Sequence, residues 1–362
     1  MPKGVDAVAL GGNKLLEQRR LSALLTGLWN FKAQRGLRDW IKANDTSTTI
    51  YHVHGFHQTL SPSVLCPLKR VKSRTVMHAH DYFLACPNGA FFDFQSAKTC
   101  NRRPLSFQCV SRNCDKRNYF HKLWRVARQF LQNKTRYRLL PDVVTVLIHE
   151  AMERRLFPQG AGGPVVPIAN PAVSLLETPV SAERNADVVF VGDIHEYKGV
   201  FLLAEAGRRA GVPVLFAGAG LGLAQLKKQY PEHRYAGWQD RNGLRNVLSK
   251  ARLLVAPTLG PEPFGLAPVE ALLSGVPVAI TDEMSLSQDI VSREMGRSFK
   301  AGDIDELTEV ISHLANDDLA IARMSENASL RAEELSLPPV KWCRELCDVY
   351  AGLLEDAVNK AR

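Results

Sequence analysis

The sequence predicts an α/β protein of two domains, each built on a parallel sheet whose strands alternate with helices. The chain has 362 residues, which is more than one hydrophobic core usually organises. Predicted strands alternate with predicted helices in two separate runs, as parallel α/β sheets require. Residues 167–179 lie between these runs and have the composition of a linker. We therefore predict domains at residues 1–180 and 181–362.

The first run is read from hydrophobic periodicity. Its predicted elements are, in order, a helical region (15–42), a strand (48–55), a short helix (61–69), a strand (74–81), a basic helix (116–140), a strand (142–148) and a short helix from residue 150. Residues 84–115, with their Cys, Asn, Pro and paired Arg residues, break the rhythm and are predicted to be a long irregular insertion.

The alternation restarts after the linker. The predicted elements are a strand (187–193), a helix (198–210), a strand (212–218), a helix from residue 221, a helix (241–250) and a strand (252–259). From residue 303 onward the pattern is helical, and a C-terminal helix carries one apolar face. The second run thus predicts an independent α/β domain with a helical C-terminus.

Charge is distributed unevenly along the chain. Residues 1–140 carry 24 Lys/Arg and 7 Asp/Glu, a net charge of +17, whereas the remainder carries 22 and 30, a net charge of −8. A basic half suits a phosphate-bearing substrate, an anionic membrane face or a nucleic acid, and a solvated basic surface without a partner is equally compatible. Without an apolar run of about 18 residues or a signal-peptide pattern, we expect a cytoplasmic protein.

Two carboxylates stand eight positions apart in the nearly uncharged segment GPEPFGLAPVEALLSGVPVAITD, residues 260–282. Glu262 is predicted on the loop that leaves a strand. Pro268 suits the first position of a short helix, which would place Glu270 in the first turn of that helix. In open parallel sheets this edge binds ligands.

The chemistry of this segment suits a nucleotide sugar. Backbone N–H groups from Phe264 to Leu266 at the helix start would attract a phosphate, and a neighbouring carboxylate would accept hydrogen bonds from sugar hydroxyls. The alternative is that Glu270 only favours the helix dipole while Glu262 is solvated.

The same segment closely resembles the Glu-x7-Glu signature of the retaining family 4 glycosyltransferases, whose GT-B fold has two Rossmann-like domains facing across a cleft. Further similar segments in the C-terminal half are FVGDIHEYKG, LFAGAGLG, YAGW and ARLLVAP, in the family order, and in the N-terminal half TTIYHVHGFH, TVMHAHDYFLACPNG and VPIANP. The resemblance covers residues 48–316 and implies transfer of a hexosyl group from a nucleoside diphosphate sugar to a saccharide or lipid-linked acceptor, as in cell-surface polysaccharide synthesis.

The resemblance also assigns roles to matching residues. Glu262 would contact hydroxyls of the transferred sugar and Glu270 the ribose, while the backbone of Phe264, Gly265 and Leu266 would cap the donor. In the phosphate loop, which includes Gly192, Lys198 would offset charge on the departing diphosphate. His80, at a strand end of the N-terminal domain, would face the reacting sugar carbon.

Such enzymes retain anomeric configuration by front-face attack through an oxocarbenium-like state, so no cofactor is expected to be required for catalysis. Two departures from the family pattern stand out. Asp193 occupies the position where the phosphate loop usually carries an Arg, and the first strand, turn and helix of the family are missing or shortened. Either departure would suit a catalytically impaired protein that still binds nucleotide sugars.

Four cysteines, Cys86, Cys100, Cys109 and Cys114, fall within the insertion. Their spacing lacks the paired C-x2-C of a strong zinc signature, yet four thiols could clamp a loop that has little core of its own. A structural zinc ion and reduced packing cysteines are therefore both open. If the insertion is ordered, we expect it to shape the choice of acceptor.

Partners follow from these assignments. The basic half is expected to meet the acceptor, and the inner face of the plasma membrane as an anionic surface, so that the protein would be peripheral there. Nucleic-acid binding is the less favoured alternative, because no cysteine spacing matches a known finger and the aromatic residues are not interleaved with the basic ones.

Overall fold

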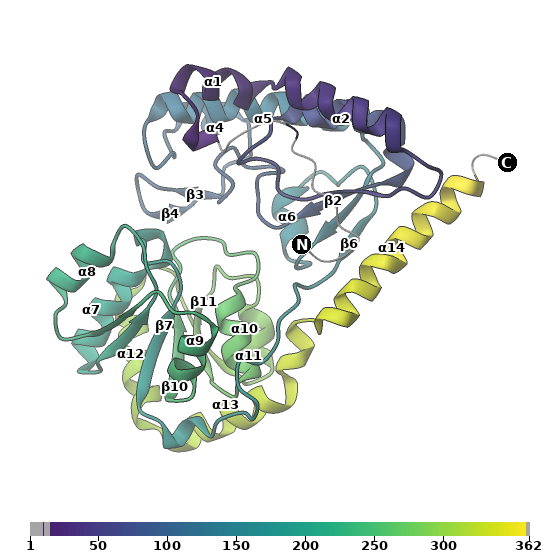
Figure 1. Ribbon diagram of the computed structural model, residues 1–362. Coiled ribbons are helices and arrows are strands. Elements are labelled where there is room, and N and C mark those ends of the chain that lie inside the picture. Colours follow the sequence, from purple (N-terminus) through teal and green to yellow (C-terminus); the bar gives the residue numbers. More distant parts are fainter. Residues whose placement is uncertain (1–9, 11–14, 360–362) are drawn as a thin grey trace. The chain divides into compact units, whose positions relative to one another are not determined.

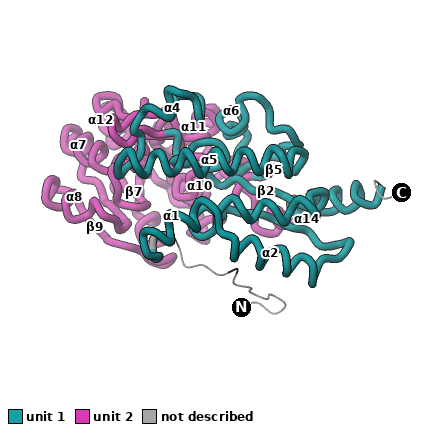
Figure 2. Tube along the Cα trace, turned by 90° about the horizontal axis from the view of Figure 1, so that it is seen from above, with its two compact units in different colours: residues 1–91, 101–168, 344–362 teal, residues 92–100, 169–343 magenta. Residues whose placement is uncertain are grey.

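The computed structural model describes residue 10 and residues 15–359 (Figure 1). The chain divides into two compact units, which have different colours in Figure 2. Unit 1 comprises residues 1–91, 101–168 and 344–362, and unit 2 comprises residues 92–100 and 169–343. This division differs from the predicted boundary at residue 180: the change of unit falls at 168/169, and the two ends of the chain belong to the same unit.

Unit 1 is built on a parallel sheet of four strands in the order β1-β2-β5-β6. The strands are β1 (Tyr51–Val53), β2 (Thr75–Ala79), β5 (Val144–Leu147) and β6 (Val165–Pro167). Every residue of β2 and β5 is buried, as in parallel strands that are covered on both faces. Strand β6 was missed, because the neighbouring glycines and prolines suggested a linker; it lies at the edge of the sheet, where a Pro is tolerated.

Helices complete unit 1. They are η1 (Leu15–Glu17), α1 (Arg20–Leu28), α2 (Phe31–Asn44), η2 (Pro62–Val64), α3 (Leu65–Leu68), η3 (Lys69–Arg74), α4 (Phe107–Ser111), α5 (Tyr119–Leu139) and α6 (Met152–Leu156). The single helical region predicted at 15–42 is divided between α1 and α2, where Asn30 accepts a hydrogen bond from Ala33 N (2.9 Å) and so caps α2.

The predicted insertion at 84–115 is ordered. It contains α4 and a two-stranded antiparallel hairpin, β3 (Phe92–Asp93) and β4 (Lys98–Thr99). The hairpin segment Phe92–Cys100 belongs to unit 2, although the sequence on both sides of it belongs to unit 1.

Unit 2 is built on a parallel sheet of six strands in the order β12-β11-β10-β7-β8-β9. The strands are β7 (Asp187–Val191), β8 (Val214–Ala217), β9 (Arg234–Gly237), β10 (Ala251–Ala256), β11 (Val278–Thr281) and β12 (Gly296–Phe299). The strand order reverses between β7 and β10. Ligands of doubly wound sheets bind at this switch point, beyond the carboxyl ends of the strands.

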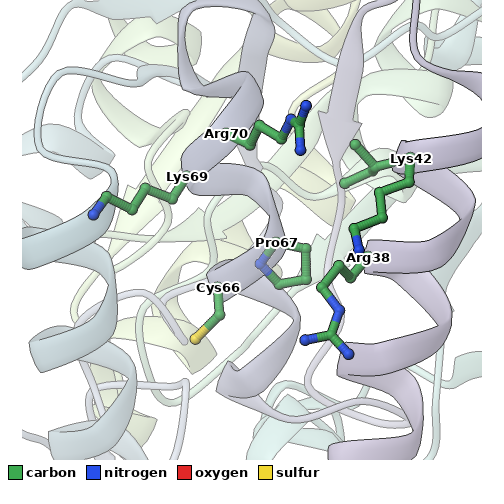
Figure 3. Close-up of a pocket in the computed structure, with 7 residues that line it drawn as sticks. Arg38, Lys42, Cys66, Pro67, Lys69 and Arg70 are labelled. Atoms are coloured by element: carbon green, nitrogen blue, oxygen red, sulfur yellow. The ribbon is translucent and has the colours of Figure 1, made fainter.

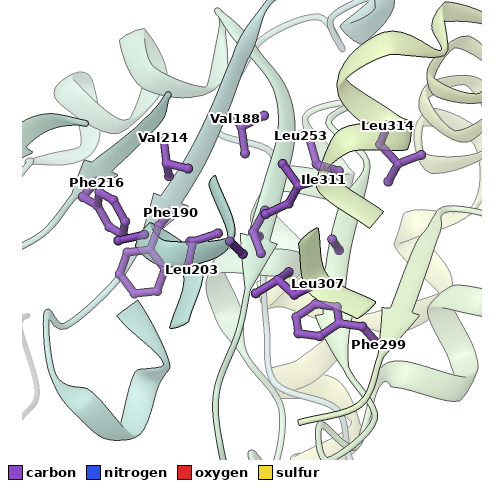
Figure 4. Close-up of a cluster of buried hydrophobic side chains, with 14 of the residues drawn as sticks. Val188, Phe190, Leu203, Val214, Phe216, Leu253, Phe299, Leu307, Ile311 and Leu314 are labelled. Carbon is purple, nitrogen blue, oxygen red and sulfur yellow. The ribbon is translucent and has the colours of Figure 1, made fainter. Parts of the chain in front are cut away.

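The helices of unit 2 pack around this sheet (Figure 1). They are η4 (Ala182–Arg184), η5 (Glu196–Lys198), α7 (Val200–Ala210), α8 (Leu223–Gln229), α9 (Arg241–Leu248), α10 (Leu266–Leu273), α11 (Ser287–Ser292), α12 (Ile304–Asn316), α13 (Asp318–Arg331) and η6 (Ala332–Leu335). In the core, Phe190 and Leu253 from the sheet pack with Leu203 of α7 and Leu307 and Ile311 of α12 (Figure 4). This apolar layer fixes β7 and β10 and therefore the loops that leave them.

The C-terminal helix α14 (Pro339–Asn359) begins in unit 2 and continues in unit 1 from Arg344. Leu346 is buried on it, and the Tyr350 hydroxyl lies 2.5 Å from His52 Nδ1 of β1. That contact accounts for the return of the chain end to unit 1. Across residues 15–359, no helix combines the length and the apolar composition needed to cross a bilayer.

Candidate functional site

The switch point of the unit 2 sheet brings a cation and a carboxylate together. Lys198 ends η5, on the loop after β7, and Glu262 lies on the loop after β10. Their Nζ and Oε2 atoms are 2.5 Å apart, with exposed side-chain fractions of 34% and 22%. Two of the predicted donor-site residues, 64 positions apart in sequence, thus form one partly buried ion pair.

Tyr197 ties these two loops to each other. Its hydroxyl donates to Pro261 O (2.9 Å), and its carbonyl oxygen accepts from Leu259 N (3.0 Å). Because Tyr197 and Pro261 are the chain neighbours of Lys198 and Glu262, the positions of the two charged residues are set by this bonding. No pattern in the sequence identified Tyr197 as part of the site.

Glycine is required where these loops approach each other closely. Gly199 follows Lys198 with φ +71°, and a Cβ atom there would lie 1.8 Å from Pro257 O. Gly265 precedes α10 with φ +88°, and a Cβ atom there would lie 2.5 Å from Met284 Cε. Both conformations are strained for any residue with a side chain, so each glycine allows the contact that shapes the site.

The backbone of Glu262 is held from the other side by the loop after β11. Glu262 N donates to Glu283 O (3.4 Å), and Glu262 O accepts from Ser285 N (3.0 Å). The predicted start of the following helix was wrong by two residues. Helix α10 begins at Leu266 and has Pro268 within its first turn, where the missing N–H of a proline is equally harmless.

This earlier start moves Glu270 out of the first helical turn, so the predicted proximity to the helix terminus was wrong. Glu270 is half-buried. Burial raises the pKa of its carboxyl, and the charge of Arg241 at the start of α9 opposes part of that rise. A half-buried carboxylate without a dominant cation is suited to accept hydrogen bonds from a polar ligand. Phe264 and Leu266, whose backbone was also predicted to contact the nucleotide sugar, differ in exposure: Phe264 is buried and Leu266 is 47% exposed.

The predicted phosphate loop also depends on close backbone approach. A Cβ atom at Gly218 would lie 1.8 Å from Gly192 O, and one at Gly220 would lie 2.6 Å from Asp193 Oδ1. Gly192 itself has φ +154°. The carboxylate of Asp193, the departure from the family pattern, is exposed and lies against the backbone at Gly220.

The hairpin from the insertion packs on this loop. The Phe92 ring meets the Tyr197 ring edge-on with centroids 4.9 Å apart, and Phe94 lies 5.7 Å from the same ring. A Cβ atom at Gly260 would lie 2.6 Å from Phe92 Cδ2, so the ring also covers the loop before Glu262. A segment of the predicted insertion therefore packs against the loops that carry Lys198 and Glu262, which its composition alone did not predict.

His80 lies in unit 1 at the end of β2, within a group of four histidines. His80 Nε2 is 2.8 Å from His54 Nδ1, and His78 Nδ1 is 3.2 Å from His52 Nε2. Burial lowers the pKa of all four, to about 4 for His52 and about 2 for His78, so all four are neutral at pH 7. The adjoining Asp81 carboxylate accepts from Phe83 N (2.8 Å) and turns the chain.

The four cysteines of the insertion are buried. Lys122 of α5 donates to Cys109 Sγ and Cys114 Sγ, each at 3.3 Å, and Cys86 Sγ bonds Asn88 Oδ1 at 3.0 Å. The zinc site proposed for these thiols stays a prediction, and the structure places an ammonium group between two of them. Among the described residues, the group with ligand atoms close enough for one ion is His52, His54 and His78.

Comparison with known proteins bears on the same part of the chain. Residues 177–331 match the family model for group 1 glycosyl transferases. A glycogen synthase of Mycobacterium tuberculosis is 24% identical over 276 residues, which are 71% of this chain and 64% of the relative. A phosphatidyl-myo-inositol mannosyltransferase of Mycobacterium leprae is 31% identical over 112 residues, 30% of each chain. The chain thus spans less than two thirds of the glycogen synthase.

Solved structures agree on the fold. Sucrose-phosphate synthase from Thermosynechococcus elongatus superposes with a TM-score of 0.65 at 16% identity, over 94% of this chain and 80% of the other. The Anabaena protein Alr3699/HepE in complex with UDP-glucose gives a TM-score of 0.60 at 17% identity, over 89% and 82%. The chain therefore has the α/β GT-B fold with a helical C-terminus, and its residues 177–331 are similar to group 1 glycosyl transferases.

Proposed function

We propose that the protein is a retaining glycosyltransferase of family 4. It would move a hexosyl group from a nucleoside diphosphate sugar to a saccharide or lipid-linked acceptor in cell-surface polysaccharide synthesis. The observation that carries this proposal is the Lys198–Glu262 pair at the switch point of a group 1 glycosyltransferase domain. The names of the relatives support hexosyl transfer, and the UDP-glucose complex of the Anabaena protein supports a nucleotide-sugar donor.

Each residue of the proposed donor site has a physical role. Lys198 would leave Glu262 and offset the charge that builds on the departing diphosphate. Glu262 would then accept hydrogen bonds from hydroxyls of the transferred sugar, and Glu270 from the ribose. The backbone of Phe264, Gly265 and Leu266, together with Gly192, would surround the phosphates.

The reaction that we propose replaces one bond at the anomeric carbon with another on the same face. The bond from this carbon to the phosphate oxygen breaks, the acceptor oxygen forms the new bond, and the acceptor proton passes to the leaving phosphate. No protein carboxylate dyad of the glycosidase type is needed for this route. His80 is the proposed catalytic residue on the acceptor side.

Donor binding tests this proposal first. We expect UDP, GDP or ADP to raise the melting temperature of the full-length protein by several degrees, because ligand binding to the native state stabilises it. Glu270→Ala should abolish the shift, whereas Glu309→Ala, on an exposed part of α12, should keep it. No shift with any of the three nucleotides, combined with tight DNA binding, would favour the nucleic-acid alternative.

Turnover separates an enzyme from an impaired relative. The purified protein should release nucleoside diphosphate from the preferred donor, and NMR of the product should find the anomeric configuration of the donor. Donor binding without release or transfer would instead indicate a protein that only binds nucleotide sugars. The exposed carboxylate of Asp193 in the predicted phosphate loop favours this alternative, because its negative charge opposes that of a diphosphate.

An anionic membrane surface is the partner that we propose for unit 1. Large apolar side chains are exposed on its helices: Leu21 (77%), Leu25 (71%), Phe31 (74%), Phe120 (62%) and Phe130 (58%). Helix α5 carries six Lys or Arg residues and no acidic residue. Apolar side chains among basic ones are the composition of surfaces that bind anionic bilayers.

A pocket with a mostly apolar lining surface, to which four basic residues contribute, supports the same partner. It has a volume of about 350 Å³ and lies between α2 and the α3–η3 segment, with Ile41, Cys66 and Pro67 in its wall (Figure 3). Arg38 and Lys42 come from α2, and Lys69 and Arg70 from η3. Its cations would attract the phosphate of a lipid headgroup or of a lipid-linked acceptor.

Liposome co-sedimentation tests the membrane proposal. Binding should require anionic lipid, weaken as salt is raised and fall in a Leu21→Glu/Leu25→Glu variant. Leu319→Glu, at an 85% exposed leucine of unit 2, should have no effect. Equal sedimentation with neutral and anionic vesicles at low salt would contradict it.

A further inference from the structure

Two adjacent parallel strands of unit 1 place four imidazoles side by side. His52 lies in β1 and His54 directly follows this strand. In the same way His78 lies in β2 and His80 directly follows it. The register sets Val53 opposite Met77, so residues two apart on each strand share one face of the sheet. The rings of His52 and His78 consequently stack face to face, with centroids 5.2 Å apart, and the His54 ring is tilted against both, at 4.1 Å from His52 and 5.1 Å from His78.

Three of these histidines offer nitrogen atoms to one point. One ring nitrogen from each of His52, His54 and His78 lies within 4.8 Å of the other two. Two nitrogens bound to the same tetrahedral zinc ion, at about 2.0–2.1 Å from it, are roughly 3.3 Å apart. Side-chain movements on the order of 1 Å would therefore bring the three nitrogens to ligand spacing, without a change in the strands.

A buried nitrogen in this group lacks a hydrogen-bond partner. His78 is 4% exposed, and within the part of the chain that the structure describes its Nε2 atom has no partner. A buried polar atom without a partner destabilises the folded state, and a bound cation is one way of satisfying it.

Hydrogen-bond partners orient the rings of His52 and His54, as is usual for histidines that bind a metal ion. The Tyr350 hydroxyl lies 2.5 Å from His52 Nδ1, which leaves the other nitrogen of that ring directed at the group. His80 Nε2, at 2.8 Å from His54 Nδ1, orients His54 in the same manner. Metal-binding histidines usually have such a partner on the second nitrogen, because it sets the tautomer and the ring orientation.

We propose that His52, His54 and His78 bind one divalent transition-metal ion of the zinc class, with the fourth position taken by water. Imidazole ligands favour zinc, nickel and copper over magnesium and calcium. His80 is the orienting partner of His54 and stays outside the ligand set. The three ligands all belong to unit 1, and zinc binding is measured without donor or acceptor, so the site is tested apart from the proposed sugar transfer, in which His80 takes part.

Zinc titration of the tag-free, chelator-stripped full-length protein tests the site. Competition with a chromophoric chelator should reveal one bound zinc ion, and saturation should raise the melting temperature of the protein. His54→Ala, at an exposed position, and His52→Ala should each weaken zinc binding by about 100-fold or more. His313→Ala, at an exposed histidine of α12, should bind zinc as the wild type does.

Cobalt substitution distinguishes this site from the cysteines of the insertion. Cobalt bound by imidazoles should give d–d bands without the near-ultraviolet charge-transfer band of thiolate ligation. A cobalt spectrum with thiolate bands alone, a zinc stoichiometry that both histidine substitutions leave unchanged, or the absence of a bound equivalent would each overturn the proposal. Donor binding by unit 2 is measured separately, so failure of either proposal leaves the other standing.

Discussion

The ring of Phe92 packs edge-on against the ring of Tyr197, with the two centroids 4.9 Å apart. Phe92 begins the hairpin that interrupts the unit 1 sequence, and Tyr197 immediately precedes Lys198. An element from the N-terminal half of the sequence thus packs on the predicted phosphate loop of the other half. We therefore expect the hairpin to influence the proposed donor site, in addition to any effect on the acceptor.

Removal of the Phe92 ring should loosen the Lys198–Glu262 pair. Phe92→Ala loses the contact with Tyr197, whose hydroxyl bonds Pro261 O, and small displacements at a site of this kind reduce rates strongly. We expect donor turnover to fall by about tenfold or more in steady-state assays. Phe107→Ala, which removes an 86% exposed ring from the same insertion, should leave turnover unchanged. Equal rates in both variants would contradict a supporting role for the hairpin.

Gly199 should tolerate no side chain. Alanine there combines a left-handed φ of +71° with a Cβ atom 1.8 Å from Pro257 O, so the loop must move. We expect Gly199→Ala to lower the free energy of unfolding by more than about 1 kcal/mol and to abolish the thermal shift by nucleotides.

The matched control for this prediction is Gly352→Ala in α14, where a new Cβ atom would meet no atom within 4 Å. Alanine is the better helix former, so a small stabilisation of about 0.5–1 kcal/mol is expected there. Urea unfolding of both variants decides the matter, and a stable Gly199→Ala protein with normal nucleotide binding would refute the role given to this glycine.

Donor affinity should depend on pH through Glu270. Burial raises the pKa of this carboxyl above its usual value, so its ionised form is lost at a higher pH than for an exposed glutamate. An ionised carboxylate accepts hydrogen bonds from ribose hydroxyls, and a protonated one is a poorer acceptor. Isothermal titration should therefore find nucleotide affinity falling as pH drops toward 5. Glu270→Gln should bind weakly and lack this pH dependence, and an identical pH profile in both proteins would exclude Glu270 as its source.

His57 should reduce stability in acid. Its ring is stacked between those of Phe56 and Phe83 and is partly buried, and the loss of hydration lowers its pKa to about 3. The charge of Arg128 acts in the same direction, and the hydrogen bond to Gln132 opposes it. Because the unfolded chain takes up this proton near pH 6.5 and the folded chain does not, stability falls as pH decreases from about 6.5 toward 3.

The size of this effect can be measured by substitution. In His57→Phe, which keeps an aromatic ring but cannot titrate, the loss of stability between pH 7 and 5 should be smaller by up to about 1.4 kcal/mol per pH unit. Urea unfolding at several pH values compares the two proteins, and the other histidines contribute equally to both. Parallel pH profiles would contradict the assignment to His57.

The strands of the unit 2 sheet were easier to predict from the sequence than the contacts within the candidate site. Apolar runs such as DVVFV and ARLLVA are continuous because both faces of β7 and β10 are covered, and such runs can be read from one sequence. Strand β12 (GRSF) was missed, because its residues include exposed Arg297 and lack that continuity. Lys198 and Glu262 were both predicted to be site residues. Their 2.5 Å contact was not predicted, because it depends on the order of the strands in the sheet, which no local sequence pattern encodes.

The histidine group was visible in part. The alternation in YHVH and MHAH is apparent in the sequence, but convergence of the four rings required β1 and β2 to be neighbours in parallel register. The position of Phe92 beside Tyr197 could not be predicted either. It depends on contacts between segments about 100 residues apart, and periodicity contains no information at that distance.

The chain passes from one unit to the other at four places, after residues 91, 100, 168 and 343. Dissection of the protein by truncation would consequently mislead. A fragment cut at the linker would separate a sheet from either its hairpin or its last helix, and the exposed apolar surfaces left behind would promote aggregation. The roles of the two units should instead be studied by point substitution in the intact polypeptide.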